Sequence, residues 1–307
     1  MKISRLLPVS ARVYLRSVLH KQNFTQPHER TPVDLRSTSV GITQAFEICN
    51  GTPFLLDVPI ADCRGLRGLA FPCGCNSTHP FIVSLNEYRK NKDIKSIEQV
   101  LALFYETVEP STVGQLLGLA EKISHPFLSL GPLCYEYPWD GIPNARLQKT
   151  RISSITREAV SHGAANVYQG WHHFGPLSKE RVSLEASRLV RVYEDIAQSK
   201  YKRNNSSDGD IEGIVLQCDK ENKVLITQGH HRIAALSVLG HEKITVRFGK
   251  SVTAPLVIRD QVEQWVGVNN EGFNLDDARI VFDRIFLGEQ PAICNQWNQQ
   301  QSGVLKK

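Results

Sequence analysis

The chain has 307 residues, which is enough for one large domain or two ordinary ones with a sizeable hydrophobic core. Its hydrophobic fraction of 41% and charged fraction of 22% are typical of soluble globular proteins, and no apolar run approaches the roughly 18 residues of a membrane span. The net charge of +5 resides entirely in residues 1–36, so the rest of the chain is neutral, which argues against a broad nucleic-acid-binding face.

The seven cysteines are an odd number spread over a long chain, unlike the disulfide framework of a small secreted domain. The basic N-terminus also lacks the continuous apolar core of a secretion signal. We therefore expect a cytoplasmic protein with free thiols. The alternative is an organelle transit peptide, because the start of the chain is rich in arginine and poor in acidic residues.

Residues 3–20 mix apolar and basic side chains, and Pro8 limits any helix to the C-terminal side of this segment. We favour a helix packed on the body, or a frayed terminus. The other interpretation is a basic amphipathic helix that brings residues 1–21 to an anionic membrane surface. Residues 22–40 are polar, contain two prolines and are typical of a linker.

Residues 41–150 form a mixed region with weaker signals. Phe54–Ile60 is predicted to be a strand, and Ser96–Glu106 a helix capped by Ser96. A second helix is expected after Pro110, and residues 138–141 are typical of a turn.

Residues 151–250 carry the clearest pattern. Lys179–Gln198 is predicted to be a helix because apolar residues recur at helical spacing. A short helix, Ile233–Leu239, ends at Gly240. The strands predicted around it are Ile214–Cys218, Val224–Thr227 and Ile244–Phe248.

The C-terminal part adds a possible strand at Leu256–Arg259 and a helix at Leu275–Leu287. Asn274 is expected to cap this helix, and Gly288 to end it. The segment after Pro291 is polar, so we predict that it is disordered.

The most informative motif is Gly-His-His-Arg at residues 229–232, between a predicted strand and a predicted helix. A helix N-terminus binds anions through free N–H groups, and Gly229 would let the backbone approach a phosphate closely. Arg232 can bind phosphate oxygens in a bidentate way, and His230 and His231 supply donors that titrate near neutrality. The alternative is a turn whose histidines merely cap the helix.

The run ITQGHHRIAALSVLGHEKITVRF resembles the strand–GxHR–helix–LG–strand signature of the ParB/sulfiredoxin superfamily. The upstream pairs Arg188-Leu189 and Tyr193–Ile196, followed by Asp210–Leu216, are similar to the same family's pattern. The resemblance covers about residues 175–250, roughly a quarter of the chain. It implies an α/β fold of mixed α+β type, with a small sheet-and-helix domain joined to an accessory N-terminal region.

The branches of this superfamily differ in chemistry, so the motif has to be compared residue by residue. Sulfiredoxins need a cysteine where this chain has His230, which argues against that activity. Partition proteins use a Gly-Glu-Arg-Arg box and a following helix-turn-helix, but the residues after Lys250 contain no basic helix pair. The nearest form is the Gly-His-His-Arg of ATP- or ADP-dependent free-serine kinases, where the motif holds nucleotide phosphates.

In that branch an upstream glutamate activates the hydroxyl acceptor. Glu180 and Glu185 are the candidates for this base, and His231 joins them as a catalytic candidate. The alternative for both glutamates is an ordinary place in the first turns of a helix, which its dipole favours. Gln228 stands where that branch commonly has an aspartate that could help to hold a metal.

A second unusual cluster lies just before the long helix. Trp171 and His172 are predicted to line the same cleft and contact the nucleotide, with Trp171 or Phe174 stacking on a base or sugar ring. Together with the histidines of the motif, His172 and His173 could instead form a metal site. An aromatic loop packed on the sheet is the third interpretation.

Three cysteines and a histidine, Cys63, Cys73, Cys75 and His79, suggest zinc at first sight. No two of these cysteines are separated by two to four intervening residues, as zinc sites usually require, so free thiols are expected and no metal ligand is assigned.

We predict a nucleotide-dependent phosphotransferase or hydrolase that acts on a small hydroxyl-bearing acceptor, using ATP, ADP or CTP with Mg²⁺. One alternative is a nucleotide-binding switch or adaptor without turnover. A second alternative is a nuclease, but the absence of net charge after residue 36 argues against it. Nucleic acid is not expected as a partner. The expected segments are a basic segment and linker (1–40), an accessory mixed α/β region (41–150), the ParB/sulfiredoxin-like domain (151–260), a helical extension (261–290) and a disordered tail (291–307).

Overall fold

The computed structural model describes residues 31–119, 125–203, 209–249 and 254–305. The predicted basic helix or membrane-surface segment in residues 1–21 lies outside these ranges. None of the helices found within them is long and apolar enough to cross a membrane.

The described chain is a mixed α/β fold built on an eight-stranded sheet, which confirms the predicted fold class. Strand order is β1-β2-β7-β5-β6-β3-β4, with β8 paired to β5. The strands are β1 (Val33–Asp34), β2 (Phe54–Pro59), β3 (Cys63–Gly65), β4 (Phe71–Pro72), β5 (Glu212–Cys218), β6 (Glu221–Gln228), β7 (Lys243–Phe248) and β8 (Leu256–Ile258).

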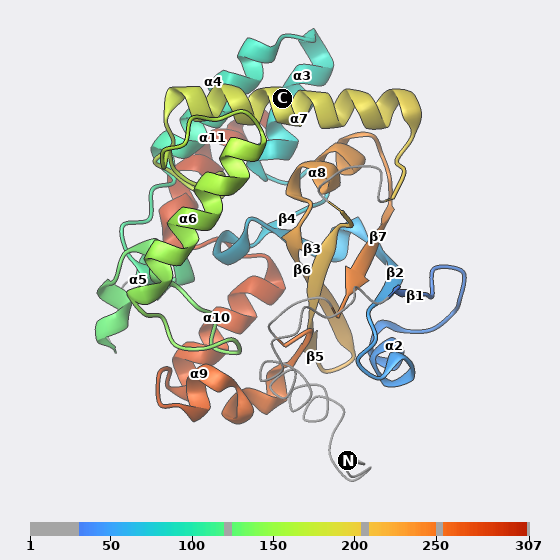
Figure 1. The fold of residues 1–307 in the computed structure, drawn as a ribbon, viewed down its shortest axis with the longest axis vertical. Coiled ribbons are helices and arrows are strands. Elements are labelled where there is room, and N and C mark those ends of the chain that lie inside the picture. Colours follow the sequence, from blue (N-terminus) through green and yellow to red (C-terminus); the bar gives the residue numbers. More distant parts are fainter. Residues whose placement is uncertain (1–30, 120–124, 204–208, 250–253, 306–307) are drawn as a thin grey trace.

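Helices surround this sheet (Figure 1). The α-helices are α2 (Ile42–Cys49), α3 (Pro80–Asn91), α4 (Ile94–Thr107), α5 (Val113–Leu117), α6 (Arg146–Ser161), α7 (Lys179–Ser199), α8 (His230–Val238), α9 (Val266–Asn269), α10 (Leu275–Leu287) and α11 (Asn295–Leu305). Short 3₁₀ helices are η1 (Ile60–Asp62), η2 (Arg67–Leu69), η3 (Pro126–Ser129), η4 (Pro132–Cys134), η5 (Arg259–Gln264) and η6 (Ala292–Cys294).

The sheet includes strands from both sides of the expected boundary at residue 150. β2 runs antiparallel to β7, with Phe54 opposite Phe248, and β3 runs parallel to β6, with Cys63 opposite Val224. Residues 41–150 therefore supply strands to the same sheet as residues 151–260, and the boundary does not separate two sheets.

Periodic segments fold as their patterns predict. The apolar stripe of α7 is buried, and the β5–β6 hairpin turns at Asp219, whose φ is 51°. Asn274 accepts a hydrogen bond from the Asp277 amide at 2.8 Å, and Gly288 ends α10 with a φ of 76°. Both predicted ends of α10 are thus confirmed.

The helix α4 starts earlier than predicted. Asp93, not Ser96, caps it, because the Asp93 carboxylate accepts the amide hydrogen of Lys95 at 3.0 Å. A carboxylate is an equally good cap, and the apolar pattern begins at Ile94.

The predicted disorder after Pro291 is wrong, because this segment forms η6 and α11. Trp297 is fully buried, donates its indole N–H to the Thr78 carbonyl at 2.7 Å and packs edge-on against Phe104. A large buried aromatic side chain thus anchors a helix whose other described side chains are polar.

The layout around α8 positions the candidate site. α8 follows directly on β6, and α7 and α3 pack against it. In Figure 1, α7 crosses one end of the molecule just above α8. The Gly-His-His-Arg motif therefore lies between the end of a central strand and two covering helices.

Candidate functional site

Gly229 is the first residue of the turn between β6 and α8. Its φ of 92° lies in the left-handed region, and a Cβ there would lie 2.9 Å from the Ile211 side chain. Glycine is therefore required for two reasons. The sequence predicted that a phosphate would come close to Gly229. The space beside this residue is instead occupied by the Ile211 side chain.

The Arg232 side chain is hydrogen-bonded to backbone carbonyl groups of the protein itself. Its guanidinium donates to the Gly209 carbonyl and, at 3.2 Å, to the Asp210 carbonyl, and the residue is only 9% exposed. The Asp210 carboxylate pairs in turn with Arg203 at 2.9 Å. Arg232 thus holds the chain at residues 209–210 against α8, rather than presenting a free bidentate fork.

His231 pairs with the carboxylate of Glu185 on α7, at 2.9 Å between Nε2 and Oε2. The imidazole also stacks on the ring of Phe81 from α3, with centroids 4.8 Å apart. Two helices distant in sequence therefore fix the orientation of this histidine.

Glu185 is fully buried and contacts two arginines of its own helix, Arg181 at 2.7 Å and Arg188 at 3.0 Å. Burial by itself raises the pKa of Glu185, but the hydrogen bond from His231 and the nearby positive charges outweigh it and hold that pKa well below its usual value. Glu185 is therefore ionised at neutral pH.

Glu158 of α6 completes a charged network with the same two arginines. Its carboxylate lies 2.8 Å from Arg181 and 2.7 Å from Arg188. Two carboxylates and two guanidinium groups thus neutralise one another behind His231, which makes their burial tolerable.

Glu180 lies apart from this network. It is exposed in the first turn of α7, and its pKa is lowered by hydrogen bonds from its own backbone and from Ser178. These are the interactions of an ordinary helix-terminal glutamate. Of the two predicted bases, only Glu185 is brought to the Gly-His-His-Arg turn.

The loop before α7 comes next to the turn, as the second cluster suggested. Ring centroids of His172 and His173 are 4.3 Å apart, His173 lies 4.7 Å from His230, and His172 lies 5.8 Å from His231. Trp171 stacks on His173 at 4.2 Å. Four histidines from two segments of the chain therefore lie close together. Trp171 contacts this group by stacking on His173.

Burial keeps three of these histidines neutral. It lowers the pKa of His172 to about 4 and the pKa values of His173 and His230 well below the usual range, with charged neighbours adding to the effect in His173 and His230. His230 Nδ1 faces the Leu66 amide at 3.5 Å, which assigns its hydrogen to Nε2. That Nε2, and Nδ1 of His172 and His173, are buried with no partner among the described residues.

Arg67 adds a positive charge beside the histidines. Its guanidinium donates to the Thr227 carbonyl at 2.9 Å, its Nε is buried without a partner among the described residues, and its charge lowers the pKa of His173 and His230. Arg67, the N-terminal end of α8 and the imidazole N–H groups give the site a positive character that suits an anion.

Sequence reasoning missed five residues of the site: Arg67, Phe81, Glu158, Arg181 and Arg188. The spacing of Arg181, Glu185 and Arg188 on one helix face was a usable signal, since residues three and four apart are neighbours. Nothing in the sequence indicates that Arg67 or Phe81 reaches the motif, because both come from a distant part of the chain.

The donor set does not fit a metal held by protein side chains. Within the described ranges, no three His, Cys, Asp or Glu side chains are arranged to hold a metal ion. The carboxylates nearest the turn, Glu185 and Asp210, are already paired with arginines, which leaves no free acidic ligand for Mg²⁺ between them.

The cysteine group suggested by the sequence does not form a zinc site either. Cys63, Cys73 and His79 are buried, but Cys75 is exposed. Nδ1 of His79 accepts the Phe81 amide hydrogen at 3.2 Å and caps α3. All seven cysteines are free, as expected.

No protein-family model, curated protein or solved structure matches this chain. The resemblance to the ParB/sulfiredoxin superfamily therefore stays a prediction that rests on the motif residues alone.

Proposed function

We propose that the protein is a nucleotide-dependent phosphotransferase or hydrolase with a ParB/sulfiredoxin-like site, acting on a small hydroxyl-bearing acceptor. The observation that carries this proposal is the pair formed by buried, ionised Glu185 and His231 at the start of α8. A carboxylate that orients an imidazole beside a helix N-terminus is suited to proton transfer next to a bound anion.

In the proposed reaction His231 is the base and Glu185 its orienting partner. Nε2 of His231 lies 2.9 Å from Glu185 Oε2, so we assign the hydrogen to Nε2 and leave Nδ1 to accept the proton of the acceptor hydroxyl. The negative charge of Glu185 stabilises the imidazolium that results. The phosphate end of the nucleotide would lie at the N–H groups of α8, close to the charge of Arg67.

Arg232 has a different role from the one its motif position suggests. Because its guanidinium is committed to the Gly209 and Asp210 carbonyls, we assign it to positioning the chain beside the turn. Trp171 and His172 line the same site, and Trp171 offers the ring face for a base or sugar.

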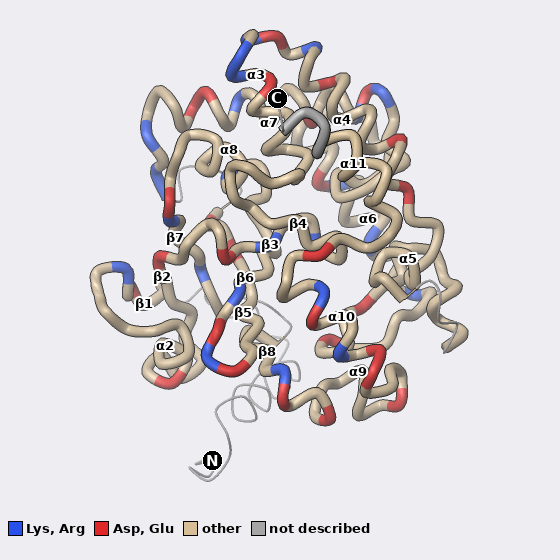
Figure 2. The backbone as a smooth tube through the Cα atoms, turned by 180° about the vertical axis from the view of Figure 1, so that it is seen from behind, with Lys and Arg blue, Asp and Glu red and all other residues tan. Residues whose placement is uncertain are grey.

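Charge and thiol distribution support a small-molecule substrate in a reducing compartment. Lys and Arg are interspersed with Asp and Glu over the described chain (Figure 2). The seven free thiols, five of them buried, support the cytoplasm as the location.

The test compares the two glutamates of α7 in an assay with ATP, ADP and CTP, each with and without Mg²⁺, and a panel of hydroxyl acceptors. We expect Glu185→Gln to lower kcat by about 100-fold or more, the usual contribution of acid–base catalysis, because His231 loses its anionic partner. The matched control, Glu180→Gln, should stay within about twofold of the original rate, since Glu180 is exposed in the same helix.

A second variant separates chemistry from folding. Glu185→Gln leaves Arg181 and Arg188 with one carboxylate fewer, so its thermal melting has to be measured alongside. His231→Gln removes the base and leaves the arginine network intact, and its rate should fall by a similar factor.

The same assays distinguish the alternative functions. Nucleotide binding without turnover on any acceptor would leave the adaptor alternative, and degradation of plain DNA or RNA would favour the nuclease. Absence of nucleotide binding would reject the proposal.

A further inference from the structure

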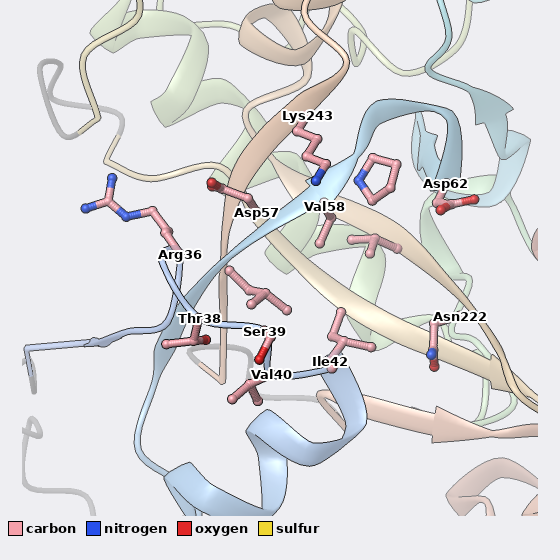
Figure 3. Close-up of a pocket in the computed structure, with 14 residues that line it drawn as sticks. Arg36, Thr38, Ser39, Val40, Ile42, Asp57, Val58, Asp62, Asn222 and Lys243 are labelled. Carbon is pink, nitrogen blue, oxygen red and sulfur yellow. The ribbon is translucent and has the colours of Figure 1, made fainter.

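A cavity of about 360 Å³ opens where the chain enters α2, away from the histidine site (Figure 3). This volume is in the range of small-molecule sites. Its walls come from the loop at residues 36–42 and from β2, η1, β6 and β7. β6 runs from this cavity, at Asn222, to the Gly-His-His-Arg turn, after Gln228, so the two sites lie at opposite ends of one strand.

The floor of the cavity is apolar. Leu56 and Val58 of β2 and Val224 of β6 line it and belong to the hydrophobic core. Val40 and Ile42, from the loop and the start of α2, close it on the other side and are only partly buried. An apolar group of a ligand would therefore be shielded from water here.

Two of the four charged side chains on the rim are neutralised by neighbours. Arg36 binds Asp34 through two hydrogen bonds, of 2.8 and 2.5 Å, and Asp62 pairs with Lys223 at 2.6 Å. The other two are Asp57 and Lys243, the exposed first residue of β7, and neither has an ion-pair partner in the described part of the chain. The rim therefore carries one ammonium group that is not compensated by a direct contact.

Asp57 does not serve as that partner. Its carboxylate accepts a hydrogen bond from the Thr245 hydroxyl at 2.7 Å, and its charge acts on Arg36. Figure 3 shows Asp57 turned toward the Arg36 side of the strand, whereas Lys243 is paired with Pro59 in the register of β2 with β7.

Asn222 supplies a second unmet group on the cavity wall. Its side-chain oxygen is buried and has no hydrogen-bond partner among the described residues. A buried acceptor without a donor costs free energy, and a ligand hydroxyl or amino group would remove that cost.

We propose that this cavity binds a small carboxylic acid that has an apolar body and a hydrogen-bond donor. The carboxylate pairs with Lys243, the apolar body covers Leu56 and Val58, and the donor bonds the Asn222 oxygen. This site is independent of the nucleotide site and does not require that the proposed function be correct.

Leucic acid, the α-hydroxy analogue of leucine, is a suitable probe, and its primary amide, 2-hydroxy-4-methylpentanamide, is the uncharged comparison that keeps the hydroxyl donor. Titration of the full chain, followed by thermal melting, should give a saturable stabilisation with leucic acid, because a ligand of the folded state raises its stability by mass action. The primary amide should bind at least about tenfold more weakly, since it lacks the charge-assisted hydrogen bond.

Three variants locate the site. Lys243→Gln should weaken leucic acid binding about tenfold, and Ser39→Trp, which fills the cavity from an exposed rim position, should abolish it. Lys149→Gln removes the same charge from an exposed position on α6 and should leave binding unchanged. No saturable shift with leucic acid, or equal binding by the original chain, Lys243→Gln and Ser39→Trp, would overturn the proposal.

Discussion

Single residues at the turn are constrained by the protein's own packing, and Gly229 is the clearest case. Alanine there would need a φ of 92° and would place its Cβ 2.9 Å from Ile211. We expect Gly229→Ala to lower the free energy of unfolding by about 1–3 kcal/mol, because strain in the left-handed region adds to the overlap. Chemical denaturation measures this, with Gly74→Ala as the control, since no atom lies within 4 Å of a Cβ at Gly74.

A midpoint for Gly229→Ala equal to that of Gly74→Ala would mean that the turn relaxes without cost. It would also reopen the space beside Gly229 for a ligand, because Ile211 would then be free to move aside.

The sequence alone does not distinguish the two candidate glutamates of α7. Glu180 and Glu185 lie five residues apart near the start of one helix, and either could have been the base. The choice depends on which of them faces His231, and that partner comes from α8, 46 residues further along the chain than Glu185. Local pattern carries no information about such a contact. The position of the motif directly after a strand was predicted, but α8 starts at His230, three residues earlier than expected.

Elements with a clear period were predictable, and those without one were not. α7 and α10 each carry one apolar stripe, and the strands β5, β6 and β7 are short apolar runs beside turn residues. α3 and α6 were missed for opposite reasons. The N-terminal half of α3 is buried on all sides, so it shows little periodicity, and α6 buries only Ile155 and Ala159.

The packing of α11 includes one large buried side chain, Trp297, whose contribution is testable. Trp297→Ala should lower the free energy of unfolding by about 3–5 kcal/mol, because a fully buried indole and its hydrogen bond to Thr78 are lost. Gln299→Ala, at an exposed position of the same helix, should change it by less than about 0.5 kcal/mol. Equal stability of the two variants in urea would restore the disordered tail that the polar composition suggests.

At the scale of the whole molecule, the sheet pairs strands that are far apart in the sequence. β3 has three residues, including Arg64 and Gly65, and lies beside β6 only because the chain folds back over more than 150 positions. Pairing over such distances follows from the packing of the complete core. The family resemblance therefore indicated the fold class, but the boundary expected at residue 150 divides the strands of one sheet between two segments of the chain.

The same close packing buries several neutral histidines, which should make global stability depend on pH. Burial lowers the pKa of His79 to about 3 and that of His172 to about 4, whereas an unfolded histidine titrates near 6.5. The unfolded chain then binds more protons than the folded one between those values, so stability present above about pH 6.5 is lost as the pH falls toward 4. Each such histidine contributes a slope of up to about 1.4 kcal/mol per pH unit in that window.

His79→Asn tests this dependence, because it retains a side chain able to cap α3 and removes the titration. Its free energy of unfolding, measured in urea from pH 7 to 5, should fall less steeply than that of the original chain. His241→Asn, at an exposed position, should keep the original slope, and identical slopes for all three proteins would show that His79 is not held neutral by burial.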